Sequence, residues 1–226
     1  MRPLKVAWKG KIMEKKVLTK KERIREMTML ALFIAIIALL GLTPAPYGTT
    51  LGFFRVYGQV EATIIHIPVL VGAALFGKRF GIYLGLAFGV VSNIAAFIYS
   101  PYFFIYPWVA ILPRLAFGFL IVYFVDFSLK IFKNKYIAVG VSFFVLTLVH
   151  AVMTLGMLYT VFPMVMELPY NWTTFGYYFT WLAINAGVPW ITLGEAVLAG
   201  IVGGTIVIRL AKTQNIKKYI STEGVE

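Results

Sequence analysis

The sequence contains no cysteine among its 226 residues, which excludes disulfides, thiolate metal sites and cysteine nucleophiles. Only two histidines are present and they lie far apart in the chain, so a dedicated zinc site is disfavoured. Charged residues make up only 13% of the chain, against about a quarter in soluble domains. We therefore expect neither a metal nor another cofactor, and the low charge disfavours an ordinary soluble fold.

Hydrophobic residues account for 60% of the chain, more than a soluble domain of this length can bury. A bilayer core about 30 Å thick needs roughly 20 apolar residues for each helical span. The apolar region, residues 27–210, has room for six such helices and their connections. The sequence thus predicts an all-α integral membrane protein with six transmembrane helices.

Turn-forming, basic and aromatic segments separate the expected spans. The first span ends at Pro44-Ala45-Pro46, and Gly77-Lys78-Arg79 follows the second. The last span follows a long aromatic loop, Pro163–Thr180, of the kind found at membrane interfaces. The expected spans cover about residues 27–42, 60–76, 80–98, 108–127, 137–161 and 181–209.

The basic residues predict the orientation, because Lys and Arg near span ends favour the cytoplasmic side. Ten lie in residues 1–26, two follow the second span, three follow the fourth, and four lie near the C-terminus. With six spans, 19 of the 21 fall on one side, so we expect both termini in the cytoplasm. Residues 1–26 would form a basic arm and residues 211–226 a tail. The net charge of +12 beside hydrophobic helices indicates anionic lipid rather than nucleic acid as its partner.

Polar side chains inside the expected spans form one layer. An ionisable group at mid-helix costs about 2.5–3.5 kcal/mol to insert, so such groups face the bundle interior. At a rise of about 1.5 Å per residue, five of them lie roughly 18–24 Å above the cytoplasmic end of their span. The cytoplasmic half has almost none, which favours an outward-facing pocket over a proton or ion path. The five are His66, Asn93, Arg114, His150 and Glu195.

Arg114 is the foremost candidate for a ligand contact, because a guanidinium can hold a carboxylate or phosphate through two parallel hydrogen bonds. The alternative is that Arg114 only neutralises Glu195 or Glu61. The histidines and Asn93 have the alternative role of hydrogen bonding between helices. The aromatic segment up to Trp181 is interpreted either as a lid over the pocket or as an interfacial belt. The complete predicted substrate-binding set is Arg114, His66, Asn93, His150, Glu195, Asn185, Glu61 and Trp181.

Small residues recur every four positions in three expected spans, where they let helix backbones approach closely. We expect the stripes Gly81-xxx-Gly85-xxx-Gly89 and Ala196-xxx-Gly200-xxx-Gly204 to pack inside the bundle. Ala31 and Ala35, flanked by large apolar residues, are instead predicted to receive a helix of a partner protein, and the alternative is that they too pack inside the bundle.

The chain has no recognisable energy source of its own. Residues 72–78 imitate the start of a phosphate-binding loop, but Arg79 stands where Ser or Thr should follow. Gly-x-Ser-x-Gly and His-Glu-x-x-His motifs are also missing, so we do not expect an enzyme. Two other functions stay open: an intramembrane enzyme that uses Glu61, Glu195 and the histidines, and a proton-coupled carrier that acts alone.

Over about residues 27–210 the sequence resembles the substrate-binding (S) components of energy-coupling factor (ECF) vitamin transporters. The resemblance rests on the size, on six spans with both ends inside, and on Ala31-xxx-Ala35. The segment from His66 to Gly81 and the tripeptide Leu112-Pro113-Arg114 strengthen it.

The resemblance implies a subunit of a bacterial cell membrane that captures a small water-soluble vitamin from outside. It also implies docking through Ala31 and Ala35 onto a transmembrane scaffold subunit that is driven by two ATPase subunits. The sequence is most similar to pantothenate-type and riboflavin-type members. We favour pantothenate, because Arg114 would hold its carboxylate, and keep riboflavin, folate and cobalamin as alternatives.

Overall fold

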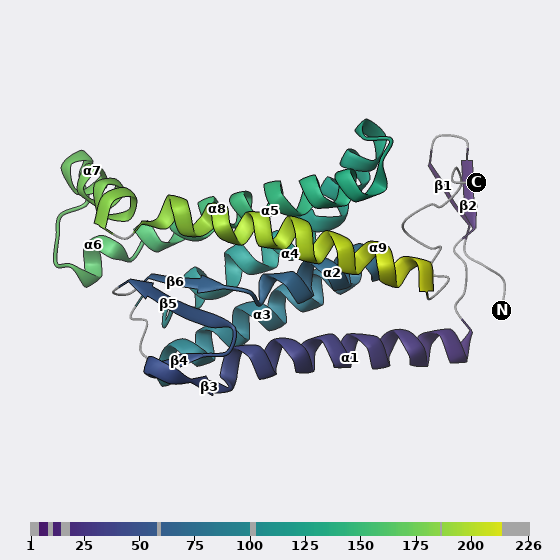
Figure 1. Cartoon of the computed structure of the whole chain (residues 1–226), viewed down its shortest axis with the longest axis horizontal. Helices are drawn as coiled ribbons and strands as arrows, with labels where there is room; N and C mark the ends of the chain where they lie inside the picture. The colour runs from purple at the N-terminus through teal and green to yellow at the C-terminus, as the bar shows by residue number, and fades with distance from the viewer. Residues whose placement is uncertain are drawn as a thin grey trace.

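The computed structural model describes residues 5–8, 11–14, 19–57, 60–99, 103–185 and 187–213. Long helices lie side by side along the molecule (Figure 1). A small sheet and two short helices lie together at one end of the bundle. The connections that follow the helices ending at Leu42, Tyr99 and Tyr159 lie at this end. Most of the predicted N-terminal arm and C-terminal tail falls outside these residues, apart from the hairpin β1 (Lys5–Trp8) and β2 (Lys11–Glu14).

Among the described residues, five helices are long and apolar enough to cross a membrane. They are α1 (Lys20–Leu42), α3 (Lys78–Tyr99), α4 (Pro107–Ile131), α5 (Lys135–Tyr159) and the continuous helix formed by α8 (Val188–Leu198), a π-helical turn (Ala199–Gly203) and α9 (Gly204–Thr213). At about 1.5 Å per residue each exceeds the roughly 30 Å of a bilayer core. The chain is therefore a multi-pass helical protein.

The second predicted span, residues 60–76, is not one helix. It consists of strand β6 (Val60–Thr63) and the 11-residue helix α2 (His66–Phe76). Pro68 lies in the first turn of α2, where proline is tolerated, and Gly77 ends it with φ 93°, a conformation that glycine adopts without strain. At about 1.5 Å per residue α2 crosses only half a bilayer, so the sixth full span stays a prediction.

The prediction of an all-α protein is wrong in one respect, because residues 44–63 form a four-stranded antiparallel sheet. Its strands are β3 (Pro44–Ala45), β4 (Thr49–Thr50), β5 (Phe53–Tyr57) and β6, in that order. A single 3₁₀ turn, Pro46–Gly48, joins β3 to β4. Pro44 and Pro46 stop α1 from continuing, and the threonines, aromatics and valines that follow favour strands. The expected loop around Arg55 is thus strand β5.

Two helix boundaries also differ from the prediction. Helix α1 begins at Lys20 rather than near Met27, because the Thr19 hydroxyl accepts a hydrogen bond from the Glu22 N–H and the Glu22 carboxylate accepts one from the Thr19 N–H. The segment predicted as an aromatic loop contains α6 (Phe162–Val165) and α7 (Trp172–Thr180). Asn171 caps α7 by accepting from the Thr174 N–H at 2.8 Å, a start signal that the sequence carries.

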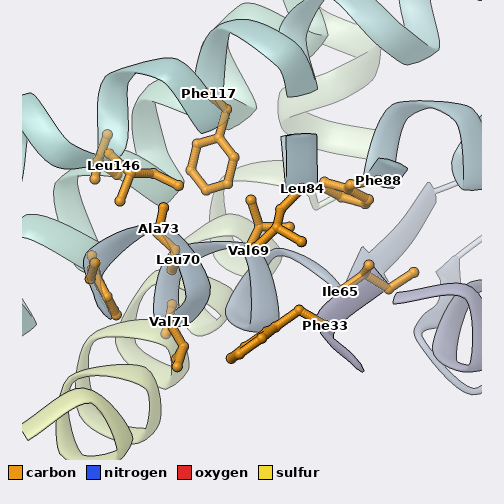
Figure 2. Packing of buried hydrophobic residues seen from close by; sticks show 14 of the residues in the cluster. Phe33, Ile65, Val69, Leu70, Val71, Ala73, Leu84, Phe88, Phe117 and Leu146 are labelled. Atoms are coloured by element: carbon orange, nitrogen blue, oxygen red, sulfur yellow. The ribbon is translucent and has the colours of Figure 1, made fainter. Parts of the chain in front are cut away.

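The short helix α2 lies in the middle of the bundle and has eight of its 11 residues buried. Its side chains pack against every long helix that surrounds it. Figure 2 shows Val69, Leu70, Val71 and Ala73 of α2 among Phe33 of α1, Leu84 and Phe88 of α3, Phe117 of α4 and Leu146 of α5. The half of the bundle that contains α2 is therefore filled with apolar side chains.

Glycines bring α3 and α4 into backbone contact. A Cβ on Gly81 would overlap the carbonyl oxygen of Gly118, and a Cβ on Gly85 would lie 2.5 Å from the carbonyl oxygen of Arg114. In the last long helix, a Cβ on Gly200 would lie 2.9 Å from the carbonyl oxygen of Gly140 in α5. Both glycine stripes pack inside the bundle, as predicted.

Replacing Gly81 by alanine should destabilise the protein, because the added methyl group meets backbone that cannot rotate away. We expect a loss of about 1–3 kcal/mol, the usual cost of overpacking, measured as a lower midpoint of thermal unfolding in detergent. Gly156→Ala is the matched control, since nothing lies within 4 Å of its Cβ position. Equal midpoints for the two variants would contradict this account of the α3–α4 contact.

Candidate functional site

A cavity opens at the end of the bundle that carries the sheet. It encloses about 1140 Å³ of space between atoms, including its mouth. The sheet, α3, α4, α5, the turn after α7, and α8 form its walls. Aromatic side chains line it, among them Tyr99, Phe103, Phe104 and Trp181. Its polar lining consists of Thr49, Thr50, Thr63, Ser92, Arg114, His150, Thr154, Thr192 and Glu195.

Arg114 is the cation of this cavity, and it is only 3% exposed. Its Nη1 donates to the carbonyl oxygen of Ala110 at 2.7 Å, one turn back along α4. The guanidinium carbon lies 4.9 Å from the ring centre of Phe88 and 5.0 Å from that of Phe104, in cation–π contact. Its Nε has no hydrogen-bond partner.

Glu195 does not neutralise this cation, because within the described residues no ion pair joins the two side chains. The Glu195 carboxylate accepts a hydrogen bond from the backbone N–H of Thr63. This contact ties α8 to the end of strand β6, across more than 130 residues of sequence. The alternative partner, Glu61, has a side chain outside the part of the chain that the structure describes.

His150 lines the cavity from α5 and is 6% exposed. Its ring packs against Phe117, with ring centres 4.8 Å apart, and against Phe88 at 5.8 Å. One turn further on, the hydroxyl of Thr154 lies 3.4 Å from its Nε2. His150 and Thr154 thus present two hydrogen-bonding groups on one face of α5.

Trp181 is the member of the aromatic segment that reaches the cavity. Its ring centre lies 6.0 Å from that of Phe162. Tyr178 packs against the same ring and donates its hydroxyl to the carbonyl oxygen of Leu155 at 2.6 Å, and burial raises the pKa of that hydroxyl. Trp172, in contrast, is 86% exposed. The segment thus contributes both to the cavity wall and to an exposed aromatic surface.

Four predicted site residues lie elsewhere or outside the described side chains. The side-chain amide of Asn93 donates to the carbonyl oxygens of Phe104 and Ile105, at 2.8 and 3.0 Å, and so holds the α3–α4 connection. This bond within the protein joins α3 to a connection rather than to another helix, so it differs from the alternative role of bonding between helices. The side chain of Asn185, like that of Glu61, is not described.

His66, the first residue of α2, is 1% exposed and is absent from the cavity wall. Neither of its ring nitrogens has a hydrogen-bond partner. The members of the predicted layer therefore do not all line one cavity. The cavity brings together Arg114, His150, Glu195 and Trp181.

Several lining residues were missed, chiefly hydroxyls. Thr154 follows His150 by four positions and Thr192 precedes Glu195 by three, so each shares a helix face with a predicted residue. That spacing is a signal the sequence carries. Thr49, Thr50 and Phe53 could not be found in this way, because only the fold of the sheet brings them over the cavity.

Ala31 and Ala35 are both exposed on α1, whereas Phe33 and Ile37 are buried on its opposite face. The stripe therefore points away from the bundle. Within the described residues no three His, Asp or Glu side chains lie close enough to hold a metal ion.

Residues 25–202 match the protein family described as ECF transporter, substrate-specific component. The chain belongs to this family. It is thus a membrane-embedded transporter component of vitamin uptake and not an enzyme, and the resemblance seen in the sequence is confirmed. The pantothenic acid transporter PanT of Lactococcus lactis subsp. cremoris (strain MG1363) is 28% identical over 213 residues, which cover 87% of this chain and 98% of that protein.

The contact between Glu195 and strand β6 predicts different outcomes for two substitutions of Glu195. Glu195→Ala leaves the Thr63 N–H without an acceptor and should lower the free energy of unfolding by about 1–3 kcal/mol. Glu195→Gln keeps an acceptor oxygen and should retain wild-type stability. Thermal unfolding of both ligand-free variants in detergent measures this. A glutamine variant as unstable as the alanine variant would show that the charge, rather than the hydrogen bond, matters.

Proposed function

We propose that this S component binds pantothenate from outside the cell and passes it to an ATP-driven ECF module. The observation that carries the proposal is a buried arginine that no carboxylate of the described residues neutralises, in a cavity whose other walls include hydroxyls, aromatic rings and aliphatic side chains, together with His150 and Glu195. The relative PanT is named as a pantothenic acid transporter, which supports the same substrate.

The physical argument starts from the cost of an unpaired cation in a membrane protein. A buried charge is stable only when it is paired or well hydrogen-bonded, and Arg114 has one hydrogen bond and two aromatic faces. An anionic ligand would supply the missing counter-charge. Pantothenate also carries hydroxyl and amide groups, for which His150, Thr154 and Glu195 offer partners around the same cavity. Riboflavin has no carboxylate to pair with Arg114, so it is the weaker candidate.

The positions of the helix ends and of the basic residues support capture of the vitamin from outside the cell. Helix α1 begins and α9 ends at the end of the bundle opposite to the sheet and the cavity (Figure 1). The α2–α3 and α4–α5 connections lie toward that same end (Figure 1), and Lys78, Arg79, Lys133 and Lys135 lie in or directly beside them. If basic residues mark the cytoplasmic side, both termini are cytoplasmic and the cavity faces outward.

Delivery to the cytoplasm requires partners, since the chain carries no nucleotide-binding motif. We propose that it docks on the ECF transmembrane scaffold, which two ATPase subunits drive. The exposed Ala31 and Ala35 on α1 fit this role, because small side chains let a partner helix approach closely.

Arg114→Ala should weaken pantothenate binding by about 2–5 kcal/mol, the range seen when a buried hydrogen-bonded charge loses its partner. Isothermal titration of the purified chain in detergent, without ATP, measures the affinity. Arg79→Ala is the control, because Arg79 is exposed and outside the cavity wall, and it should bind as the wild type does. An Arg114→Ala variant with wild-type affinity would remove Arg114 from the binding site.

A further inference from the structure

Two buried polar groups of the cavity wall have atoms without a hydrogen-bond partner: Oγ of Ser92 on α3 and Nε of Arg114 on α4. Each residue is only 3% exposed. Leaving a buried donor unpaired costs about 1–3 kcal/mol, and more next to a charge. Both groups border the same cavity, so a molecule bound there could pair with them.

The packing of α3 against α4 brings these two groups to one place. Gly85 meets the backbone of Arg114, and Gly89 meets Ile111. The Arg114 side chain points back along α4 toward Ala110, as the hydrogen bond to that carbonyl shows. It therefore extends beside α3 from the level of Gly85 toward the level of Ser92.

The Phe88 ring confirms this direction. The guanidinium carbon of Arg114 lies 4.9 Å from the centre of that ring. Ser92 follows Phe88 by four residues and thus lies one turn further on the same face of α3. The guanidinium therefore stands over the face of α3 that carries Ser92.

The other hydroxyls of the wall are mostly occupied within the protein. Thr49 donates to Pro46, Tyr99 donates to Leu42, and the hydroxyls of Thr50 and Thr63 accept backbone N–H groups. Thr154 lies within reach of His150. Ser92 differs because it lines the cavity and its buried hydroxyl has no such partner.

We propose that Ser92 and Arg114 form one subsite for a single carboxylate, with Ser92 as a residue that determines specificity for the anion. The Arg114 Nε–H and the Ser92 O–H both donate, and the two oxygens of a carboxylate accept both. A neutral alcohol in the same position accepts more weakly and cannot compensate the cation. This inference rests on the proposed function, which makes pantothenate the ligand that supplies the carboxylate.

The test compares pantothenate with panthenol, its analogue in which a CH₂OH group replaces the carboxylate. Isothermal titration of the full-length chain in detergent gives both affinities for the wild type, Ser92→Ala and Ser92→Thr. We expect Ser92→Ala to lower the pantothenate affinity by about tenfold or more, the effect of losing a hydrogen bond to a charged group. Its panthenol affinity should change by less than about twofold, and Ser92→Thr, which keeps a hydroxyl, should restore most of the loss.

Ser142→Ala is the matched control. Ser142 is equally buried, but it donates to the carbonyl oxygens of Ala138 and Phe124 and is outside the cavity wall, so both affinities should stay unchanged. Equal losses for the two ligands in Ser92→Ala, or no loss for pantothenate, would overturn the carboxylate subsite and leave the proposed function standing. A wild-type protein that does not bind pantothenate would overturn the proposed function and this inference with it.

Discussion

The backbone contact between α3 and α4 is the constraint on which the candidate site depends. Gly81, Gly85 and Gly118 leave no side chain between the two helices, so their backbones touch along several turns. One of these contacts is with the carbonyl oxygen of Arg114 itself. The helix pair therefore fixes the arginine and the face of α3 opposite to it in one arrangement. In a bilayer, where lipid gives apolar side chains no reason to associate, close packing of this kind is what holds helices together.

The rest of the fold gives the cavity a closed side and an open side. The buried helix α2 fills one half of the bundle with apolar side chains, and the sheet covers the other half. Glu195 connects the two regions, because it holds the residue at which β6 ends, just before α2 begins. An unpaired arginine is costly in such surroundings, and that cost is offset when an anion binds. Under the proposed function, the same side chain would make the empty protein less stable and the bound protein selective.

Hydropathy and basic residues are enough to predict a helical membrane protein, and the rarity of charge inside the spans is enough to single out Arg114. Counting residues from the cytoplasmic end gives the depth of a side chain but not its direction around the helix. Asn93 and His66 therefore share the predicted depth and yet lie outside the cavity wall. The strands of residues 44–63 escaped prediction because they are only two to five residues long, too short to show a clear alternation of polar and apolar residues. Ser92 was passed over because a serine in a membrane helix ordinarily bonds within the protein.

The proposed function requires that the chain alone, without ATP or a partner, holds an anionic vitamin in this cavity. Equilibrium dialysis of the purified wild-type protein against radiolabelled pantothenate tests it most directly. We predict saturable retention of about one molecule per chain, reversed by unlabelled pantothenate but not by an equal concentration of panthenol. Retention no greater than in a protein-free chamber, from a sample shown to be folded, would contradict the account.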